Sequence, residues 1–144
     1  MAKQLNIFVE NRPGRVKSIA EALCAGNINI KVFTIQDRGD FGLMKIIADK
    51  PEAAYLLLAE KGFASAQKEI LAISVKDKPG NLARLTGVLL EHKINILDAH
   101  GDVVGTGKQG ICYLELDLKD LGVAKGLLEK EGFHVLSDEE LYEI

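Results

Sequence analysis

The sequence has no tryptophan, only 6% aromatic residues and no long apolar stretch. These shortages argue against an RNA-binding protein and against a membrane-spanning one. Its longest apolar runs, such as residues 53–59 and 71–75, are far shorter than the roughly 20 residues that cross a bilayer. The formal net charge is −3 and the pI is about 5.6, without a basic stripe. Because RNA-binding sheets need an aromatic platform and basic surroundings, neither nucleic acid nor a membrane is an expected partner.

Cysteine and histidine are also scarce. Cys24 and Cys112 lack any CxxC spacing, so we expect buried, reduced thiols rather than a disulfide or a metal site. His92, His100 and His134 are scattered, without a second ligand at metal spacing, and surface or packing roles are expected for them. The sequence therefore predicts no metal and no cofactor. No signal-like segment precedes the first predicted strand, which favours the cytoplasm.

The chain instead contains a repeat within a composition typical of a globular protein, 47% hydrophobic and 27% charged. The Pro-Gly pairs in residues 10–16 (ENRPGRV) and 76–82 (KDKPGNL) lie 66 residues apart. The Ile-Asn-Ile words at 28–30 and 94–96 have the same offset. Each copy is marginal in length for a stable core of its own, so we expect the two copies to bury surface against each other.

Hydrophobic periodicity predicts the same elements in each copy. Leu5, Ile7 and Val9 alternate as in a strand, and a helix-spaced apolar stripe follows the Pro-Gly turn. In the first copy the expected elements are strands near 4–9, 28–37, 41–48 and 64–68, and helices that end near Gly26 and Gly62. A separate strand near 70–76 opens the second copy. The fold class is thus α+β, two ferredoxin-like βαββαβ modules at 1–69 and 70–144, with the tail 137–144 left open between a helical turn and a strand.

Gly14 and Gly80 stand beside the predicted helix starts, where glycine costs about 1 kcal/mol relative to alanine. The approach of another group to the backbone, or an unusual dihedral angle, would justify them. A helix N-terminus presents N–H groups and partial positive charge that suit a carboxylate or phosphate. We therefore interpret both turns as candidate binding elements.

Polar side chains accompany each turn. Asn11 and Asn29 are expected within reach of one small ligand, and the second copy keeps Asn95 but has Asp77 in place of Asn11. Since a carboxylate repels a carboxylate but holds an ammonium group, the two sites should not be equivalent. Two simpler interpretations stay open: Asn11 and Asp77 as ordinary N-caps, and Asn29 and Asn95 as residues that satisfy a tight turn. Residues 105–108 faintly resemble a phosphate loop but lack the Walker spacing, so hairpin flexibility is expected there.

The repeated motif resembles that of the ACT domain family of amino-acid-binding regulatory modules. It consists of a strand end and Pro-Gly turn, followed by a helix and then by Ile-Asn-Ile. The two copies of the turn are Val9-Glu10-Asn11-Arg12-Pro13-Gly14 and Val75-Lys76-Asp77-Lys78-Pro79-Gly80. The first copy is particularly similar to the serine-binding regulatory domain of phosphoglycerate dehydrogenase. In that family the residues at the positions of Asn11 and Asn29 contact the bound amino acid. A histidine that also contacts it corresponds to Val9 here, which argues against serine as the ligand.

The resemblance implies that the modules pair side by side into one eight-stranded antiparallel sheet with helices on one face. Effectors in the family bind at that seam, and a homodimer and a regulated metabolic enzyme are implied as partners. We therefore expect a sensor of a small amino acid rather than an enzyme. The residues expected to bind the ligand are Asn11, Arg12, Pro13, Gly14, Asn29 and Ile30 in the first copy, and Asp77, Pro79, Gly80, Asn81, Asn95 and Ile96 in the second. Two alternatives are an assembly protein without a ligand, whose partner ignores amino acids, and a small enzyme.

Overall fold

The computed structural model describes residues 1–103 and 108–144, and the chain forms two compact units. The N-terminal unit comprises Lys3–Lys68 with Tyr142–Ile144, and the C-terminal unit comprises Glu69–Leu141 with Met1–Ala2. Of the predicted flexible hairpin at 105–108, residues 105–107 lie outside the described residues.

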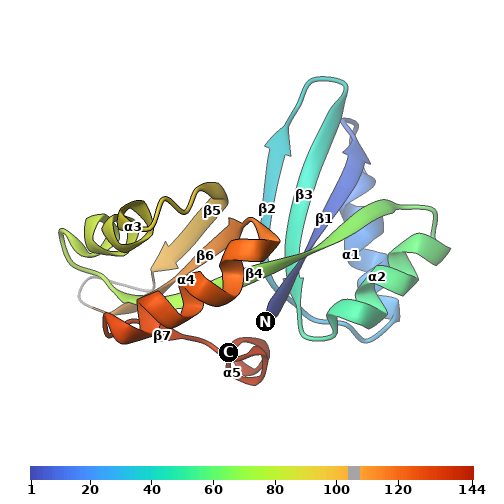
Figure 1. Ribbon diagram of the computed structural model, residues 1–144. Helices are drawn as coiled ribbons and strands as arrows, with labels where there is room; N and C mark the ends of the chain where they lie inside the picture. The colour runs from blue at the N-terminus through green and yellow to red at the C-terminus, as the bar shows by residue number, and fades with distance from the viewer. Residues whose placement is uncertain (104–107) are drawn as a thin grey trace. The chain divides into compact units, whose positions relative to one another are not determined.

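The N-terminal unit follows the expected βαββαβ order. Its elements are β1 (Ala2–Glu10), α1 (Arg15–Ala25), β2 (Ile30–Asp37), β3 (Phe41–Ala48), α2 (Pro51–Glu60) and the first part of β4 (Ala64–Lys76) (Figure 1). The strand order is β2-β3-β1-β4, and β3 is antiparallel to both of its neighbours. Pro51 opens α2 and Gly26 caps the end of α1, as predicted.

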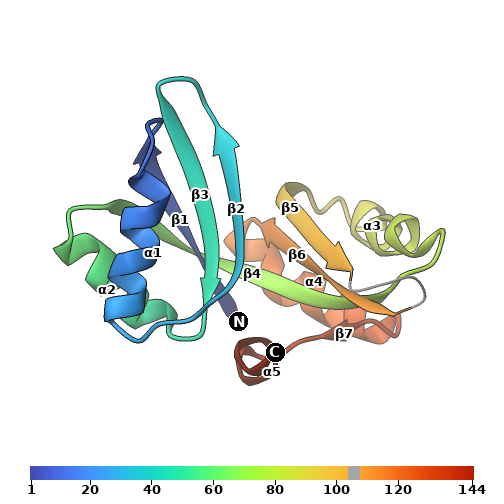
Figure 2. The same cartoon turned by 180° about the vertical axis from the view of Figure 1, so that it is seen from behind.

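Both helices of this unit lie on the same side of its strands (Figure 2). The apolar residues predicted from period-2 and helical spacing form the core between them: Leu5 and Ile7 of β1 and Ile19 and Leu23 of α1 are at most 1% exposed. The alternation in sequence therefore translates directly into a one-sided core.

The C-terminal unit repeats this plan. The second part of β4 leads to α3 (Asn81–Glu91), β5 (Ile96–Val103), β6 (Gln109–Leu116), α4 (Leu118–Lys130), the two-residue β7 (His134–Val135) and α5 (Asp138–Glu143). Its strand order, β5-β6-β4-β7, is that of the N-terminal unit with each strand replaced by its repeat. Leu71 and Ile73 pack against Leu85 and Leu89 of α3 in a second core. The duplication in sequence is a duplication of topology.

The prediction of separate strands near 64–68 and 70–76 is wrong, because one continuous strand, β4, runs from one unit into the other. No glycine or proline interrupts residues 64–76, so nothing breaks the extended backbone there. The described residues consequently contain seven strands rather than eight. The antiparallel α+β class is confirmed, whereas the side-by-side pairing of the modules stays a prediction.

The open question about the tail is resolved in favour of a helix. The Ser137 N–H donates to Glu140 Oε2 at 2.7 Å, and the Glu140 N–H donates to Ser137 Oγ at 3.2 Å. These reciprocal bonds are the capping box that the Ser-x-x-Glu spacing predicts at the start of α5.

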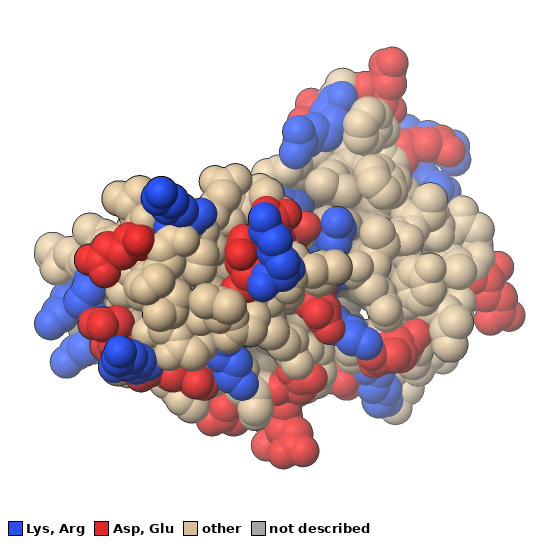
Figure 3. All heavy atoms as spheres, viewed as in Figure 1, with Lys and Arg blue, Asp and Glu red and all other residues tan. Residues whose placement is uncertain are grey.

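The surface charge agrees with the expectations from the sequence, but the exposure of one cysteine does not. On the face shown in Figure 3, acidic and basic side chains alternate without a continuous basic area. None of the helices in the described ranges is long and apolar enough to cross a membrane. Both cysteines are free, but Cys24 is exposed rather than buried, because it follows Leu23 on α1 and faces away from the core.

Candidate functional site

The two Pro-Gly turns have the same backbone geometry. Gly14 and Gly80 are the N-caps of α1 and α3, with φ of 90° and 93°. Before them, the Arg12 N–H donates to the Glu10 carbonyl at 2.8 Å and the Lys78 N–H donates to the Lys76 carbonyl at 2.9 Å. A Cβ on either glycine would meet nothing within 4 Å among the described atoms. The dihedral angle, rather than a close approach within the protein, is therefore what requires glycine.

Asn11 is not an N-cap, contrary to one interpretation of the sequence. Its Nδ2 donates to the Gly39 carbonyl at 2.8 Å and to Asp37 Oδ1 at 3.2 Å, both in the β2–β3 hairpin. Pro13 likewise lies in the turn before α1, and not in its first helical turn, since Gly14 is the cap. Arg12 forms an exposed ion pair with Glu10, 2.7 Å between Nε and Oε2. The polar groups of this turn are thus engaged within the N-terminal unit.

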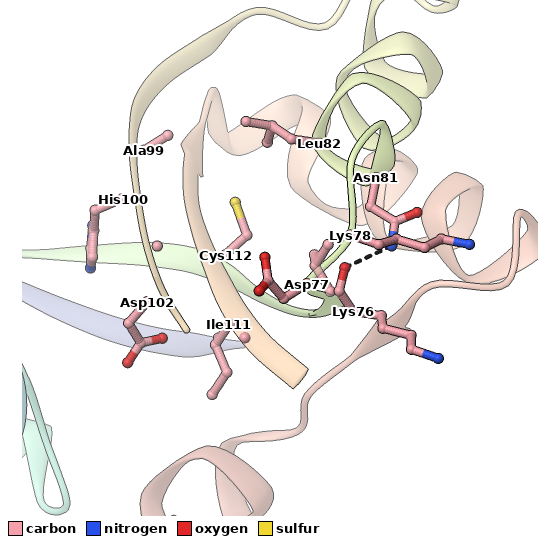
Figure 4. A pocket seen from close by; sticks show the side chains of 13 residues that line it. Lys76, Asp77, Lys78, Asn81, Leu82, Ala99, His100, Asp102, Ile111 and Cys112 are labelled. Atoms are coloured by element: carbon pink, nitrogen blue, oxygen red, sulfur yellow. Dashed lines mark hydrogen bonds between the residues drawn. The ribbon is translucent and has the colours of Figure 1, made fainter. Parts of the chain in front are cut away.

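Asp77, at the matching position of the C-terminal unit, behaves differently. Its backbone N–H donates to the Lys108 carbonyl at 2.8 Å, as the Asn11 N–H does to the Asp40 carbonyl at 3.3 Å. Its carboxylate has no hydrogen-bond or ion-pair partner within residues 1–103 and 108–144. Figure 4 shows this carboxylate directed into a pocket.

The pocket has a volume of about 420 Å³ and lies where β4 ends, α3 begins and β5 and β6 run past. The side chains of Asp77, Leu82, Ala99 and Cys112 point into it, whereas those of His100, Asp102 and Ile111 point away (Figure 4). The full lining is Val75, Lys76, Asp77, Lys78, Asn81, Leu82, Ala99, His100, Gly101, Asp102, Gly110, Ile111 and Cys112. Its walls are mostly apolar, and Asp77 is the acidic group that faces inward.

Two lysines lie at the mouth of the pocket, on the side away from this carboxylate. Lys76 and Lys78 lie at the rim and extend away from Asp77 (Figure 4). Asn81 Nδ2 donates to the Lys76 carbonyl at 2.7 Å, which holds the turn against the first residue of α3. Because a helix N-terminus carries partial positive charge, the site combines one inward anion with a positive edge. An inward carboxylate and a positive edge are complementary to a ligand that carries one positive and one negative group.

Cys112 contributes an apolar wall rather than a nucleophile. Burial raises the pKa of its thiol above the ordinary value, so the group stays protonated at neutral pH. Across the described chain no group of three or more metal-ligating side chains comes together.

On the opposite face of the same strands, His100 stacks on Tyr113 with ring centroids 4.7 Å apart and planes at 17°. Burial, and secondarily the charge of Asp102, raises the pKa of Tyr113 to about 12, which keeps the phenol neutral. His100 therefore has the packing role expected for it and does not project into the pocket.

Asn11 and Asn29 do not lie within reach of one small ligand in the same unit. They flank opposite ends of α1, whose 11 residues span roughly 16 Å. Asn29 instead pairs with Asp49, whose Oδ1 accepts the Asn29 N–H at 2.9 Å and whose N–H donates to the Asn29 carbonyl at 3.0 Å. Asn29 and Ile30 line a second, wide pocket of about 440 Å³ with Asp49 and Lys50.

The remaining predicted residues divide between the turn and the core. Pro79 and Gly80 are exposed in the turn and shape it. Asn95 is exposed beyond the far end of α3, as Asn29 is beyond α1. Ile30 and Ile96 open β2 and β5 and pack against their respective cores. Of the twelve predicted residues, the structure therefore brings only Asp77 and Asn81 into the pocket beside the second turn.

The small residues of the pocket were missed from sequence because they form no motif. Ala99, Gly101 and Cys112 are separated in sequence and belong to two strands. Superposing the two copies position by position, beyond their shared words, is the signal that reveals them.

This architecture is that of a known protein family. The sequence matches the ACT domain pair family over residues 1–144. The structure is similar to that of protein BT0572 from Bacteroides thetaiotaomicron, with 28% identity, coverage of 99% of this chain and 96% of the other, and a TM-score of 0.89. A comparison with curated proteins gave no match.

More distant similarities share the fold alone. The ligand-free regulatory subunit of aspartate kinase from Thermus thermophilus has 14% identity, coverage of 91% of this chain and 93% of that one, and a TM-score of 0.66. The regulatory subunit from Thermus flavus has 16% identity, coverage of 89% and 90%, and a TM-score of 0.60. With two repeated units, two Pro-Gly turns and a family match over its full length, the chain belongs to the ACT domain pair family.

Proposed function

We propose that this protein senses a small amino acid and regulates a partner enzyme in response. The single observation that carries the proposal is the Asp77 carboxylate, which faces into the pocket at the start of α3 without a partner among the described residues. A ligand ammonium group would supply the partner that this carboxylate lacks among the described residues.

The two poles of the site suggest how the ligand is oriented. The ammonium group pairs with Asp77, and the carboxylate lies toward the start of α3, where backbone N–H groups and the rim residues Lys76 and Lys78 favour an anion. Asn81, Pro79 and Gly80 hold the turn in shape. A contribution of Asn11, Gly14, Asn29 or Asn95 to binding stays a prediction.

The regulatory part of the proposal draws on the family and the fold. The fold is shared with regulatory subunits of aspartate kinase, and we carry a regulatory role over to this chain as a proposal. On this view residues 1–69 and 70–144 are two ACT domains of a homodimer that acts on a metabolic enzyme and has no catalytic role itself.

Calorimetric titration with each of the twenty amino acids tests the proposal. We expect at least one to bind at submillimolar concentration, and Asp77→Asn to weaken its binding at least about tenfold through loss of the charged pair. Asp120→Asn is the matched control, because that aspartate lies in the first turn of α4 and does not line the pocket. Absence of binding by every amino acid at millimolar concentration contradicts the proposal.

An assembly protein without a ligand is the second candidate, favoured by apolar exposure on β2. Phe33 and Ile35 are 62% and 47% exposed on this edge strand of the N-terminal unit. If assembly is the function, a partner enzyme recovered with the protein will bind equally well with and without amino acids.

A further inference from the structure

We propose that the two copies have diverged into one ligand site and one counterpart that does not bind the ligand. The C-terminal unit binds a single amino acid with an apolar side chain, and larger side chains stand at the equivalent positions of the N-terminal unit. This inference rests on the proposed function and specifies its stoichiometry and ligand class.

The strand registers identify the equivalent positions. In the N-terminal unit Phe33 pairs with Ile46 and Ile35 pairs with Met44. In the C-terminal unit Ala99 pairs with Leu114 and Gly101 pairs with Cys112. The last residue pair of each hairpin contains a glycine of the second strand, Gly42 in β3 and Gly110 in β6. The residue pairs of the two hairpins can therefore be matched one by one.

Side-chain size differs in the same direction at three strand positions that line the pocket, whereas Leu82 of α3 is larger than its counterpart Val16. Phe33, Ile35 and Met44 stand where the C-terminal unit has Ala99, Gly101 and Cys112. Met44 is 2% exposed in the N-terminal core, whereas Phe33 and Ile35, which pair with core residues of β3, are 62% and 47% exposed. Three side chains along the strands of the pocket are therefore smaller than their counterparts in the N-terminal unit.

The polar group differs between the copies as well. The Asn11 amide is bonded to Asp37 and Gly39, whereas the Asp77 carboxylate faces the open pocket. The N-terminal turn thus has larger side chains beside it, and it has a bonded amide where the C-terminal turn has a carboxylate. One ligand per chain follows from the two differences together.

The walls indicate the class of ligand. Val75, Leu82, Ala99 and Cys112 surround the space beyond Asp77, and Leu82 is 62% exposed without a ligand. An aliphatic or aromatic side chain removes this apolar surface from water, whereas a polar side chain loses its hydrogen bonds to water without replacement. Leucine, isoleucine, valine, methionine and phenylalanine are the expected class, ahead of serine, aspartate or lysine.

Filling the pocket with the side chains of the other copy tests the inference. Gly101→Ile introduces the residue of position 35, and its Cβ would meet the Ile111 carbonyl oxygen at 3.4 Å and Cys112 Cα at 4.0 Å, which are ordinary contacts. We expect this variant to fold and to weaken binding of the preferred apolar amino acid at least about tenfold. Ile35→Ala is the matched control and should leave affinity and stoichiometry unchanged.

Cysteine protection in the wild-type protein gives a readout that needs no variant. Cys112 lines the pocket and Cys24 is exposed elsewhere, so each chain carries its own reference thiol. With saturating leucine, or whichever apolar amino acid binds most tightly, we expect iodoacetamide to modify Cys112 several-fold more slowly and Cys24 at an unchanged rate.

The outcomes separate this inference from the proposed function. One apolar amino acid per chain, lost in Gly101→Ile and protecting Cys112, supports it. Two ligands per chain, preference for a polar amino acid, or binding that survives Gly101→Ile overturns the inference but leaves amino acid sensing intact. Failure of every amino acid to bind overturns the proposed function itself.

Discussion

Gly14 and Gly80 show how a single residue type is dictated by the backbone. Each occupies the left-handed region immediately before a helix, which L-residues with a Cβ enter only at a cost. The sequence predicted glycine at a special position but offered two reasons for it. Only the torsion angles, with open space where a Cβ would lie, distinguish strain from a close approach.

Alanine substitutions of two glycines in and beside α3 should therefore have opposite signs. Gly80→Ala is expected to lower the free energy of unfolding by about 1–2 kcal/mol, because φ is 93° there. Gly87→Ala lies within the helix, where a new Cβ would meet nothing within 4 Å, and is expected to raise it by up to about 1 kcal/mol. Urea unfolding of both variants checks this, and equal signs would refute the backbone explanation.

Asn11 and Asp77 mark the limit of inference at this scale. Both are short polar residues at the same offset, and both suit a helix cap by residue type. Neither is a cap, because glycine takes that position, and their side chains go to a hairpin in one copy and a pocket in the other. Long-range contacts, which leave no local pattern, decide between these outcomes.

At the scale of elements, the two copies also repeat their helix exits. Asn27 and Lys93 follow α1 and α3 with φ of 52° and 56°. In each case the next N–H returns to the helix, from Ile28 to the Leu23 carbonyl and from Ile94 to the Leu89 carbonyl, both at 3.0 Å. Asparagine tolerates this left-handed conformation better than lysine does, so the second exit is the more strained.

Exchanging the two exit residues tests that difference. Lys93→Asn is expected to raise the free energy of unfolding by roughly 0.5 kcal/mol, and Lys93→Gly by about 1 kcal/mol. The reciprocal Asn27→Lys should lower it by a similar amount. Urea denaturation measures all three variants, and a loss of stability in Lys93→Gly would show that the lysine side chain itself stabilises the exit.

The capping box of α5 gives a pH dependence of known sign. The Ser137 N–H and, secondarily, His134 Nε2 at 2.9 Å bind the Glu140 carboxylate and lower its pKa in the folded protein. A carboxyl whose pKa is depressed by folding contributes stability above its unfolded pKa, and this contribution is lost as pH falls through the folded pKa.

Glu140→Gln should therefore be less stable than the wild type at pH 7, and the difference should shrink as the pH is lowered through the acidic range. Urea unfolding at a series of pH values measures it. Glu139→Gln, the adjacent exposed residue of the same helix, is the control and should show no comparable pH dependence. A constant difference at all pH values would mean that charge plays no part in the cap.

At the scale of the whole molecule, each unit has a core of its own. The buried cluster that contains Ile19 and the one that contains Leu85 share no residue, and these two residues are equivalent, 66 positions apart. Both are 0% exposed. Replacing either residue with a smaller one therefore removes buried apolar contacts from the core of its own unit.

Leu85→Ala and Ile19→Ala are each expected to lower the free energy of unfolding by about 2–5 kcal/mol, because each leaves a cavity in a packed core. Amide hydrogen exchange should locate the effect, with faster exchange in β5 and β6 for Leu85→Ala and in β2 and β3 for Ile19→Ala. Equal acceleration in both units by either variant would show that they open only as one body.

The sequence by itself determined the duplication, the βαββαβ order of each copy and the membership of most core positions. Those features depend on local alternation, helical spacing and turn residues, which the chain displays in order. It did not predict that β4 is one continuous strand, and its expectation that Asn11 and Asn29 lie within reach of one ligand is wrong because the 11 residues of α1 separate them.

Only the tertiary structure decided where a ligand could fit. The pocket is lined by Ala99, Gly101 and Cys112, which come together through the register of β5 with β6. Their small size becomes evident only by comparison with Phe33, Ile35 and Met44. A cavity is a property of the space between strands and helices. No stretch of sequence contains it, because its walls come from segments that meet only after folding.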